Sequence, residues 1–218
     1  MPKMNPTISV IMSVYNGERY LKDSIESILN QSFSDFEFII INDGSTDNSN
    51  NIIIEYSKSD SRIVFVNQKN IGLTKSLNKG LKIAKGEYIA RQDSDDISDE
   101  KRFENQINFL IKGYDICCCR HFIINYNKIS PGFGFYLWKP LLLLKNTIIH
   151  GTMMINKRKL IELGGYDDNF IYSQDYKLII DFINNGCKVK YLKNVYYNSN
   201  KDSDSISIAK SKEQKKYK

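Results

Sequence analysis

Along the first 96 residues, near-continuous apolar runs alternate with stretches in which apolar residues recur every three to four positions. The first pattern is typical of buried strands and the second of helices with one apolar face. The predicted strands are Thr7–Val14, Phe36–Ile41, Ile63–Val66 and Glu87–Gln92. The predicted helices cover Tyr20–Leu29, the residues leading to Tyr56, and Leu73–Ala84. This strand-helix alternation predicts an α/β fold with a mostly parallel sheet and helices on both of its faces.

The pattern is less regular after residue 100, although it still predicts strands and helices. Helices are predicted around Phe103–Ile111, at Lys157–Leu163 and after Ser173, which we expect to cap its helix; strands are predicted at Asp115–Ile124, Thr152–Asn156, Lys188–Leu192 and Val195–Tyr197. Residues Asn127–Trp138, rich in glycine and aromatic residues, are expected to form a mobile loop. From Asn198 onward, serine, asparagine, aspartate and lysine dominate, and we expect a loose tail.

Each of the first four predicted strands is followed by polar residues. These are Tyr15 and Asn16, Asp43 and Gly44, Asn70, and the run Asp93-Ser94-Asp95. We expect Asn16 also to cap the first helix. The carboxyl ends of parallel strands meet at one edge of a sheet, where ligands usually bind. The sequence therefore predicts a ligand cleft at this edge.

The strongest chemical signal is the acidic run Asp93-Ser94-Asp95-Asp96 at the end of the fourth predicted strand. If the strand continued through the run, Asp93 and Asp95 would point to the same side. Their mutual repulsion would be relieved by Mg²⁺ or Mn²⁺, which prefer oxygen ligands and often take one or two carboxylates plus a substrate phosphate. The alternative is a solvated acidic turn that caps the next helix, but Ser98-Asp99-Glu100 can already begin that helix.

Composition and charge argue against a nucleic-acid-binding protein, a zinc- or disulfide-stabilised protein and a membrane-spanning protein. The chain has 218 residues and a net charge of +6, of which the last nine residues supply +4, so no nucleic-acid-binding face is indicated. Cys117, Cys118 and Cys119 do not have the spacing of zinc ligands or of a disulfide framework, and we expect small core residues with free thiols. With neither a signal peptide nor a membrane-length apolar run, we expect a cytoplasmic protein.

Several common catalytic motifs are absent from the sequence. It contains no GxGxxG after the first strand and no GxxxxGK[ST], which argues against dinucleotide oxidoreductases and P-loop enzymes. It also lacks a GxSxG nucleophile elbow, and with only His121 and His150 a serine-hydrolase triad is not expected.

The motifs that are present resemble those of the family 2 glycosyltransferases, from about Ile8 to Tyr197. They are Val10-Ile11-Met12-Ser13-Val14-Tyr15-Asn16, Ile40-Ile41-Asn42-Asp43-Gly44-Ser45-Thr46-Asp47, Asn70-Ile71-Gly72 with Asn78-Lys79-Gly80, Gly86–Asp96, and Gly164-Gly165-Tyr166-Asp167 leading to Gln174-Asp175. The resemblance implies a GT-A type fold, with a Rossmann-like, mostly parallel central sheet flanked by helices. It implies one domain over residues 1–198, with a nucleotide-sugar half at about 7–100, an acceptor half at about 101–198, and a flexible basic tail at 199–218.

The resemblance also implies roles for residues that bind the donor. Asp95, with Asp93, would hold Mn²⁺ or Mg²⁺ against the diphosphate of a nucleotide sugar, and Asp93 is also placed to touch the ribose. The residues expected to contact the nucleotide are Tyr15, Asn16, Asp43, Asn78, Arg91, Asp93 and Ser94, with Asp43 accepting a hydrogen bond from the base and Lys75 as an alternative to Asn78. Ordinary alternatives are a surface ion pair for Arg91 and a solvated helix face for Asn78 and Lys75.

For the acceptor, the resemblance implies that Asp175 is the general base. The family has a Glu-Asp pair here, whereas this chain has Gln174-Asp175; the alternative for Asp175 is a first-turn acid stabilised by the helix dipole. His150 is expected to contact the diphosphate, the metal or the acceptor, with a structural histidine as the alternative. A Tyr-Arg-x-His segment common in relatives is replaced here by Tyr196-Tyr197-Asn198-Ser199-Asn200.

The expected function is therefore that of an inverting, metal-dependent glycosyltransferase of hexosyltransferase type. It would move one sugar from a nucleotide-diphosphate sugar, with UDP favoured, to a hydroxyl of a glycan or lipid-linked acceptor in bacterial surface polysaccharide, lipopolysaccharide or capsule synthesis. Trp138, Leu141–Leu144 and the basic tail are candidates for peripheral contact with the inner membrane surface, although core packing explains Leu141–Leu144 equally well. The alternatives are an inactive relative that binds nucleotide or glycan as a partner subunit, and a nucleotidyltransferase, for which the chain lacks a basic, glycine-rich loop.

Overall fold

The computed structural model describes residues 5–142, 146–170 and 173–200. Its strands and helices follow one another in the order β1 (Ile8–Val14), α1 (Leu21–Leu29), β2 (Phe36–Asp43), α2 (Ser49–Ser59), β3 (Ile63–Gln68), α3 (Leu73–Ile83), β4 (Tyr88–Arg91), β5 (Ile97–Ser98), α4 (Arg102–Leu110), β6 (Ile116–Ile123), η1 (Ile124–Tyr126), β7 (Lys128–Ser130), η2 (Phe133–Leu137), α5 (Trp138–Leu142), η3 (His150–Thr152), β8 (Met154–Asn156), α6 (Lys157–Glu162), α7 (Gln174–Asn184) and β9 (Val189–Ser199). Below, residues 5–100 are called the N-terminal half and residues 101–200 the C-terminal half.

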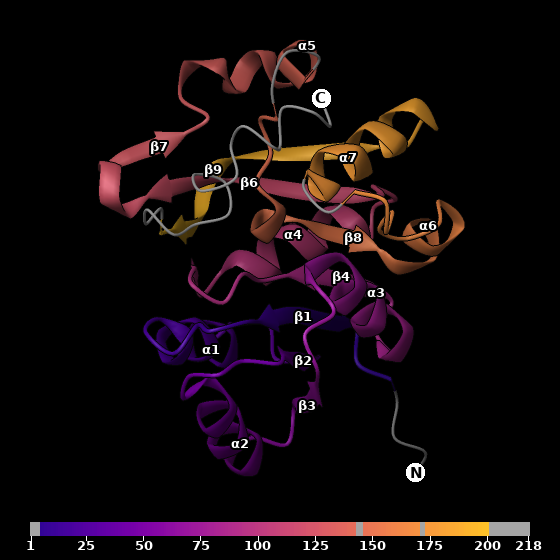
Figure 1. Ribbon diagram of the computed structural model, residues 1–218. Coiled ribbons are helices and arrows are strands. Elements are labelled where there is room, and N and C mark those ends of the chain that lie inside the picture. The colour runs from indigo at the N-terminus through magenta and orange to yellow at the C-terminus, as the bar shows by residue number, and fades with distance from the viewer. Residues whose placement is uncertain (1–4, 143–145, 171–172, 201–218) are drawn as a thin grey trace.

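One sheet runs through both halves, in the strand order β3-β2-β1-β4-β8-β6-β9-β5, with β7 paired to β6 (Figure 1). Strands β1 to β4 are parallel, as the strand-helix alternation predicts. Beyond β4 in the sheet, β6 and β9 keep this direction, whereas β8 and β7 of the C-terminal half and the short β5 of the N-terminal half pair antiparallel with their neighbours. The sheet is therefore mixed but mostly parallel, and the predicted α/β fold class is confirmed.

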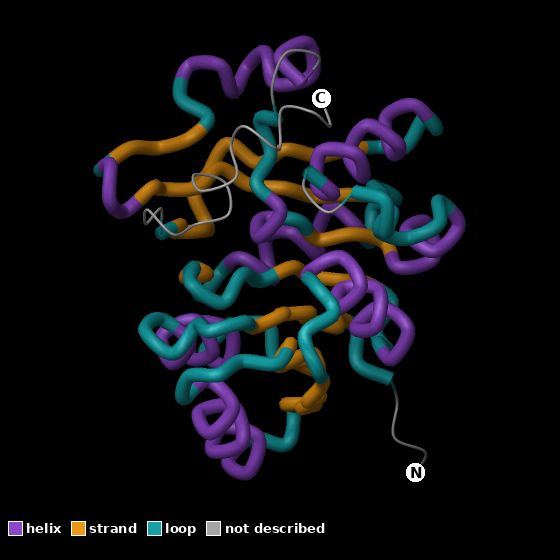
Figure 2. The backbone as a smooth tube through the Cα atoms, viewed as in Figure 1, coloured by secondary structure: helices purple, strands orange, loops and turns teal. Residues whose placement is uncertain are grey.

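The sheet has a hydrophobic core on each face. Alternate residues of β1 divide between the two cores, with Val10 and Met12 on one face and Ile11 on the other. Buried side chains of α1, α2 and α4 belong to the first core, and those of α3, α6 and α7 to the second. Helices thus cover both faces of the sheet (Figure 2). The first strand, predicted to be a buried strand from its apolar run, is buried on both faces.

The three consecutive cysteines are core residues, as predicted. Cys117, Cys118 and Cys119 lie in β6, are fully buried and carry free thiols. Cys117 and Cys119 face one core and Cys118 the other, as the alternation of a strand requires. Burial raises the pKa of all three thiols, that of Cys119 to about 11, so they are unreactive neutral groups at physiological pH.

Two predictions about the first half are wrong. Strand β4 ends at Arg91, so the acidic residues lie in the turn after it and the same-side argument for Asp93 and Asp95 does not apply. Asn16 does not cap α1, whose first cap residue is Tyr20. Instead, the Asn16 side chain accepts a hydrogen bond of 2.8 Å from the Thr46 backbone N–H and so connects two loops.

The C-terminal half differs more from its predicted elements. Residues 127–138, predicted as a mobile loop, contain β7, η2 and the start of α5. Ile97–Ser98 forms β5, and α4 begins only at Arg102 rather than near Ser98. The two predicted strands near residue 190 are one strand, β9, in which Lys193 and Asn194 are accommodated by a register shift against β6. Ser173 stands at the start of α7 but makes no side-chain cap bond.

The predicted tail and membrane segments are also partly revised. Ser199 pairs with Ile123 in the sheet, so the ordered chain continues beyond residue 198, and residues 201–218 lie outside the described residues. The Trp138 ring packs 5.7 Å from that of Tyr191, and Leu142 is buried, so these two residues belong to the core rather than to a membrane contact. Residues 143–145 lie outside the described residues. Among the described residues, no helix is both long and apolar enough to cross a membrane.

Candidate active site

The polar clusters at the ends of the first four strands converge, as predicted. Asn42 at the end of β2 lies beside Val14 of β1 and Asn67 of β3. A Cβ added to Gly44 would lie 2.6 Å from the backbone N of Asn70, so these two loops touch. A Cβ on Gly17 would likewise lie 3.3 Å from the Ser94 hydroxyl. The predicted edge of the sheet therefore exists as one connected set of loops.

Within this edge, most of the predicted nucleotide contacts are already hydrogen-bonded inside the chain. The Asp43 carboxylate is buried and accepts backbone N–H bonds of 2.9 Å from Ile71 and Gly72, and a bond of 2.8 Å from the side-chain amide of Gln68. A carboxylate held in this way orders the turn before α3, where Gly72 has the left-handed φ of +90° that favours glycine. Tyr15, in contrast, is exposed at the end of β1.

Asn78 and Arg91 take roles that sequence reasoning did not assign to them. The Asn78 amide donates to the Tyr166 carbonyl and accepts from the Tyr166 N–H, at 2.7 and 3.0 Å, which fastens the Gly-Gly-Tyr-Asp turn to α3. Arg91 is buried, with its guanidinium bonded to the carbonyls of Ile11 and Gln92 and to the Asp93 carboxylate. Arg91 is thus not a surface ion pair, because it is a buried group that positions Asp93, and its contact with the nucleotide stays a prediction.

The acidic loop, residues 93–96, is held from several directions. The Asp93 carbonyl accepts a bond from the Ser24 hydroxyl at 2.9 Å, and the Asp96 carbonyl accepts one from the Gln92 amide at 2.8 Å. Beneath the loop lies Arg102, a fully buried guanidinium that donates to the Arg91 carbonyl and to the Ser98 hydroxyl. The loop is therefore a rigid support for the carboxylates, which are its only charged side chains.

The end of β9 reaches back to the same loop. The Asn200 side chain donates to the Asp95 carbonyl at 2.5 Å, its backbone N–H donates to the Asp96 carboxylate at 2.9 Å, and the Asp93 N–H donates to the Tyr197 hydroxyl at 3.2 Å. Burial raises the pKa of Asp96 well above its usual range, and the charges of Asp95 and Asp93 add to this rise. Sequence reasoning noted residues 196–200 only as a departure from the family pattern and did not foresee that they hold the loop.

Asp175 lies in the first turn of α7, on the other side of the site. Its carboxylate accepts a bond of 2.7 Å from the Asn146 amide and one of 2.8 Å from the Tyr176 N–H. Burial raises the pKa of Asp175 above its usual value, these two bonds oppose the rise, and the negative charge of Asp93 adds to it. The two aspartates are thus near enough for their charges to interact.

The segment of residues 146–151 joins the two sides. At one end Asn146 bonds Asp175; at the other, a Cβ on Gly151 would overlap the Tyr197 hydroxyl and lie 2.8 Å from Asp93 Oδ2. Only glycine allows this close approach. Between them, His150 is buried, with its Nε2 3.0 Å from the Tyr166 hydroxyl. Burial lowers the pKa of His150 well below its usual value, so it is a neutral ring that packs within the protein. Contact of His150 with the diphosphate, the metal or the acceptor stays a prediction.

The carboxylates of the acidic loop fit the expected metal only if substrate phosphates complete its set of ligands. Among the described residues, no group of three or more His, Cys, Asp or Glu side chains is placed to hold a metal ion. One or two carboxylates do fit Mg²⁺ or Mn²⁺ when substrate phosphates complete the shell. Asp93 has one oxygen in its ion pair with Arg91 and its carboxylate is 31% exposed, and the Asp95 side chain is partly exposed. These two carboxylates are suited to such a shared site.

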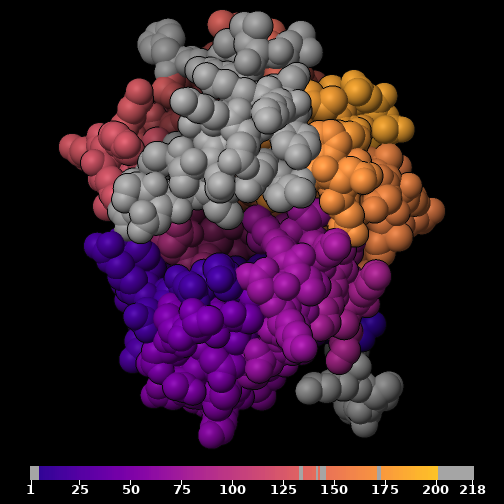
Figure 3. All heavy atoms as spheres, in the orientation of Figure 1, coloured from indigo at the N-terminus to yellow at the C-terminus, as the bar shows by residue number. Residues whose placement is uncertain are grey.

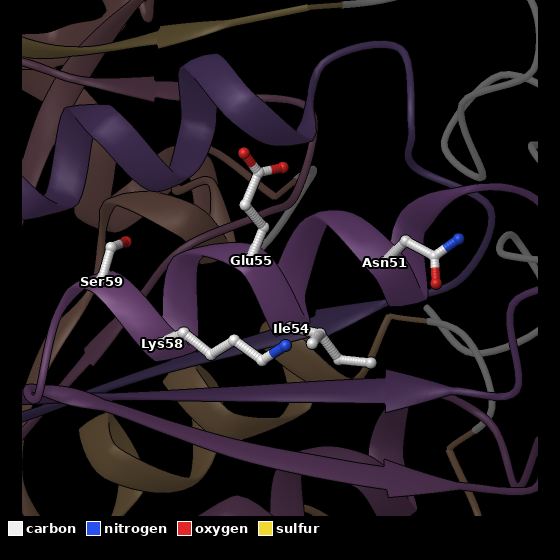
Figure 4. Close-up of a pocket in the computed structure, with 5 residues that line it drawn as sticks. All are labelled: Asn51, Ile54, Glu55, Lys58 and Ser59. Atoms are coloured by element: carbon white, nitrogen blue, oxygen red, sulfur yellow. The ribbon is translucent and has the colours of Figure 1, made fainter.

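A separate hollow of about 430 Å³ lies along the outer side of α2 (Figure 4). Its lining residues all come from this one helix: Asn51, Ile54, Glu55, Lys58 and Ser59. In Figure 1, α2 lies at the end of the molecule remote from α7. Side chains from a single helix do not converge on a ligand as those of a binding site do, so this hollow is not the site.

The comparisons with known proteins agree with this arrangement. Residues 9–176 match glycosyl transferase family 2. An uncharacterized glycosyltransferase of Methanocaldococcus jannaschii is 39% identical over 84% of this chain and 67% of its own length. Chondroitin synthase of Escherichia coli is 28% identical over 95% of this chain but 31% of its own length.

Two solved structures share the fold. The crystal structure of S. aureus TarS in complex with UDP-GlcNAc has a TM-score of 0.75 at 21% identity, over 91% of this chain and 59% of that one. The mannosyltransferase PcManGT from Pyrobaculum calidifontis, in complex with GDP-Man and Mn²⁺, has a TM-score of 0.75 at 17% identity, over 91% of this chain and 58% of that one. This chain therefore spans less than two thirds of either structure. By its fold and by the match over most of its sequence, the chain belongs to glycosyl transferase family 2.

Proposed function

We propose that this chain transfers one sugar from a nucleotide-diphosphate sugar to a hydroxyl of a glycan or lipid-linked acceptor, with inversion at the anomeric carbon. One observation carries the proposal: the acidic loop and Asp175, which are distant in sequence, are joined by residues 146–151 into one site in which the charges of Asp93 and Asp175 interact. Transfer to a hydroxyl needs these two components, one to bind the diphosphate and one to accept a proton.

On the donor side, Asp95 and Asp93 would hold Mn²⁺ or Mg²⁺. When bound, such a cation supplies Lewis-acid stabilisation of the charge that develops on the departing nucleotide diphosphate. The protein's own contribution is to keep the two carboxylates fixed, because Arg91 neutralises part of the charge of Asp93 and the loop is bonded to α1 and β9. Mn²⁺ in the structure of PcManGT with GDP-Man supports this assignment.

The nucleoside would lie over the loops that follow β1 and β2. Tyr15 is the exposed aromatic side chain there, and Asn16 and Ser94 border the same loops. Asp43 would act mainly by shaping the turn at Ile71–Gly72, since its carboxylate is buried under that turn. UDP is the favoured donor nucleotide, supported by the UDP-GlcNAc complex of TarS, which has the same fold.

Asp175 would be the general base. It takes the proton from the acceptor hydroxyl as that oxygen attacks the anomeric carbon, and the bond to the nucleotide diphosphate breaks in the same step, which inverts the configuration. Gln174 beside it is uncharged, so it adds no repulsion to a carboxylate whose pKa burial already raises. A role in bacterial surface polysaccharide, lipopolysaccharide or capsule synthesis is supported by the similarity to a polysaccharide synthase, the chondroitin synthase of Escherichia coli.

A donor-binding and donor-hydrolysis assay tests the proposal. The protein is mixed with UDP-, GDP-, CDP- and dTDP-sugars, with and without Mn²⁺, and thermal stability and released nucleotide are measured. One nucleotide should stabilise the native state, by about 2.7 kcal/mol at a hundredfold excess over Kd, and should be released in a Mn²⁺-dependent reaction. Asp95→Ala should lose both effects, whereas Asp99→Ala, which removes an exposed carboxylate just outside the loop, should keep them. Tight binding without release would indicate an inactive, ligand-binding relative instead.

A further inference from the structure

The described residues of the C-terminal half expose an unusual group of apolar and aromatic side chains. They lie on η1, β7 and η2 and are here called the hairpin surface: Ile124, Tyr126, Ile129, Tyr136 and Leu137. Tyr126 is 61% and Tyr136 66% exposed, and these five are half of the large hydrophobic residues that the described chain exposes. β7, at the upper left in Figure 1, and α5, at the top, lie far from α2. Grouped exposed apolar residues of this kind mark interaction sites.

The segments that form this region carry no carboxylates of their own, although Asp96 and Asp99 lie against the end of β9. From Ile116 to Ile161 the sequence has neither aspartate nor glutamate, and the same holds from Phe182 to Asn200, which includes all of β9. Three lysines of these segments are exposed: Lys128 in β7, Lys139 in α5 and Lys193 in β9. By contrast, residues 1–100 carry eleven Lys and Arg against fifteen Asp and Glu. The segments that carry the hairpin surface thus combine exposed apolar residues with lysines as their own charged side chains.

Arg120 keeps this surface together. Its guanidinium donates to the Pro131 carbonyl at 3.0 Å and to the Lys193 carbonyl at 3.4 Å, and lies 5.6 Å over the Phe135 ring. It thereby ties β6 to the end of β7, to η2 and to β9. The exposed tyrosines and isoleucines are thus presented on a braced support, and their exposure is a property of the folded chain.

We propose that the hairpin surface docks on an anionic phospholipid bilayer, with Tyr126, Tyr136 and the neighbouring apolar side chains entering the headgroup region. Tyrosine is well suited to that depth, because its ring is apolar and its hydroxyl polar. The exposed lysines of these segments are attracted by the negative surface potential of such a membrane. Exposed apolar residues together with a basic excess fit a lipid surface better than a second copy of the chain, whose matching face would be equally basic.

Vesicle co-sedimentation tests the proposal on the full chain. Vesicles of phosphatidylcholine alone are compared with vesicles that also contain phosphatidylglycerol, at low and high salt. We expect binding that needs the anionic lipid and weakens with salt. Lys128→Glu with Lys139→Glu should weaken it at least tenfold, since each basic residue near a membrane contributes about a fivefold effect. Tyr126→Ser with Tyr136→Ser should weaken binding without changing its salt dependence. All variants keep residues 201–218, so the contribution of that basic segment is the same in each.

Matched controls come from the rest of the chain. Lys22→Glu with Lys58→Glu exchanges two exposed lysines of α1 and α2, and Ile111→Ser removes an exposed apolar residue after α4; all three lie off the hairpin surface and should leave binding unchanged. Equal losses in hairpin and control variants would overturn the proposal. So would dimers that disappear in the Tyr126→Ser, Tyr136→Ser variant while vesicles remain unbound. Vesicle binding is measured without donor or acceptor, so it is independent of whether the proposed transfer reaction takes place.

Discussion

The two halves of the sheet are built on opposite principles. In the N-terminal half β1 to β4 are parallel, their ends meet at one edge, and side chains there are hydrogen-bonded to one another. Residues of this half, indigo to magenta, form the lower part of the molecule in Figure 3. In the C-terminal half strand directions are mixed, apolar side chains are exposed on β7 and η2, and residues 101–200 hold fourteen Lys and Arg against seven Asp and Glu.

We infer from this contrast that the N-terminal half is preformed for the proposed donor, whereas the C-terminal half carries the proposed docking surface. Bonds such as those of Asp43 and Asn16 preform the loops of the N-terminal half, which lowers the entropy cost of ordering them on binding. The site draws on both halves, because Asp93 comes from one and Asp175 from the other. The following predictions test how strictly the two halves divide these tasks.

The largest effect is expected from the proposed base of the C-terminal half. Asp175→Asn should lower kcat by about a thousandfold, because general-base catalysis contributes roughly 10² to 10⁴. Donor binding, assigned to the N-terminal half, should change little. Asp181→Asn, further along the same helix and paired with Lys177, is the control and should retain activity. Full turnover in Asp175→Asn would remove the base from the mechanism.

The same variant has an expected stability signature. Burial raises the pKa of Asp175 in the folded state. The contribution of Asp175 to the free energy of unfolding is therefore complete below its pKa in the unfolded chain, and it is lost as the pH rises through its pKa in the folded chain. At pH 7 the wild-type chain therefore carries the cost of desolvating this partly buried carboxyl group, which asparagine avoids. Asp175→Asn should unfold at a temperature equal to or above that of the wild type at pH 7, measured by calorimetry.

The next effect concerns the close contact between the halves at Gly151. Gly151→Ala places a methyl group against the Tyr197 hydroxyl and near Asp93, and should destabilise the fold by about 1–3 kcal/mol, as overpacking does. It should also weaken Mn²⁺-dependent donor binding. The double variant with Tyr197→Phe removes the overlapping oxygen but keeps the ring carbon Cζ at 2.5 Å, so it relieves the overlap only in part. If the contact is the cause, denaturant unfolding should show the double variant to be less destabilised than the sum of the single ones.

The N-terminal half could be predicted from the sequence more completely than the C-terminal half. The parallel half was predicted well because its strands are buried on both faces and its helices have clear apolar stripes, as at Ile11 and in α3. The edge clusters were predicted because parallel topology alone brings strand ends together. Hydrophobic pattern gives no warning of side-chain bonds between distant residues. That is why Arg91 and Asn78 were expected to face the ligand, although both are bonded within the chain.

The C-terminal half was predicted less well for a related reason. Residues 127–138 form β7 and η2 largely through pairing with β6 and the bonds of Arg120, which are long-range. The bonds that connect Asp96, Tyr197 and Asn200 with the acidic loop were not predicted. In the local sequence Asp96 resembles any acid in a turn, and Tyr197 and Asn200 resemble any polar residues at the end of a strand. A candidate signal was the replacement of the family's basic segment by Tyr196–Asn200, which shows that this position must be filled differently here.

A smaller effect is expected where β9 holds the acidic loop. Asn200→Ala removes the side-chain bond to the Asp95 carbonyl and should cost about 1 kcal/mol of stability. If the loop is positioned from the C-terminal half, KM for the donor should rise several-fold while kcat changes little. Asn194→Ala, an exposed amide in the same strand, is the control for steady-state kinetics. An unchanged KM would mean that the N-terminal half orders its loop without help from β9.

The smallest effect concerns the proton affinity of the base. Because the pKa of Asp175 lies above its usual value, kcat/KM should fall as pH decreases through that raised pKa, and the acid limb should lie above the usual aspartate range. The Asn146 amide favours the charged carboxylate, so Asn146→Ala should shift this limb to still higher pH. Asn185→Ala at the far end of α7 should leave it in place. An acid limb that does not respond to Asn146→Ala would mean that the profile reports a group other than Asp175, and that the C-terminal half does not supply the base.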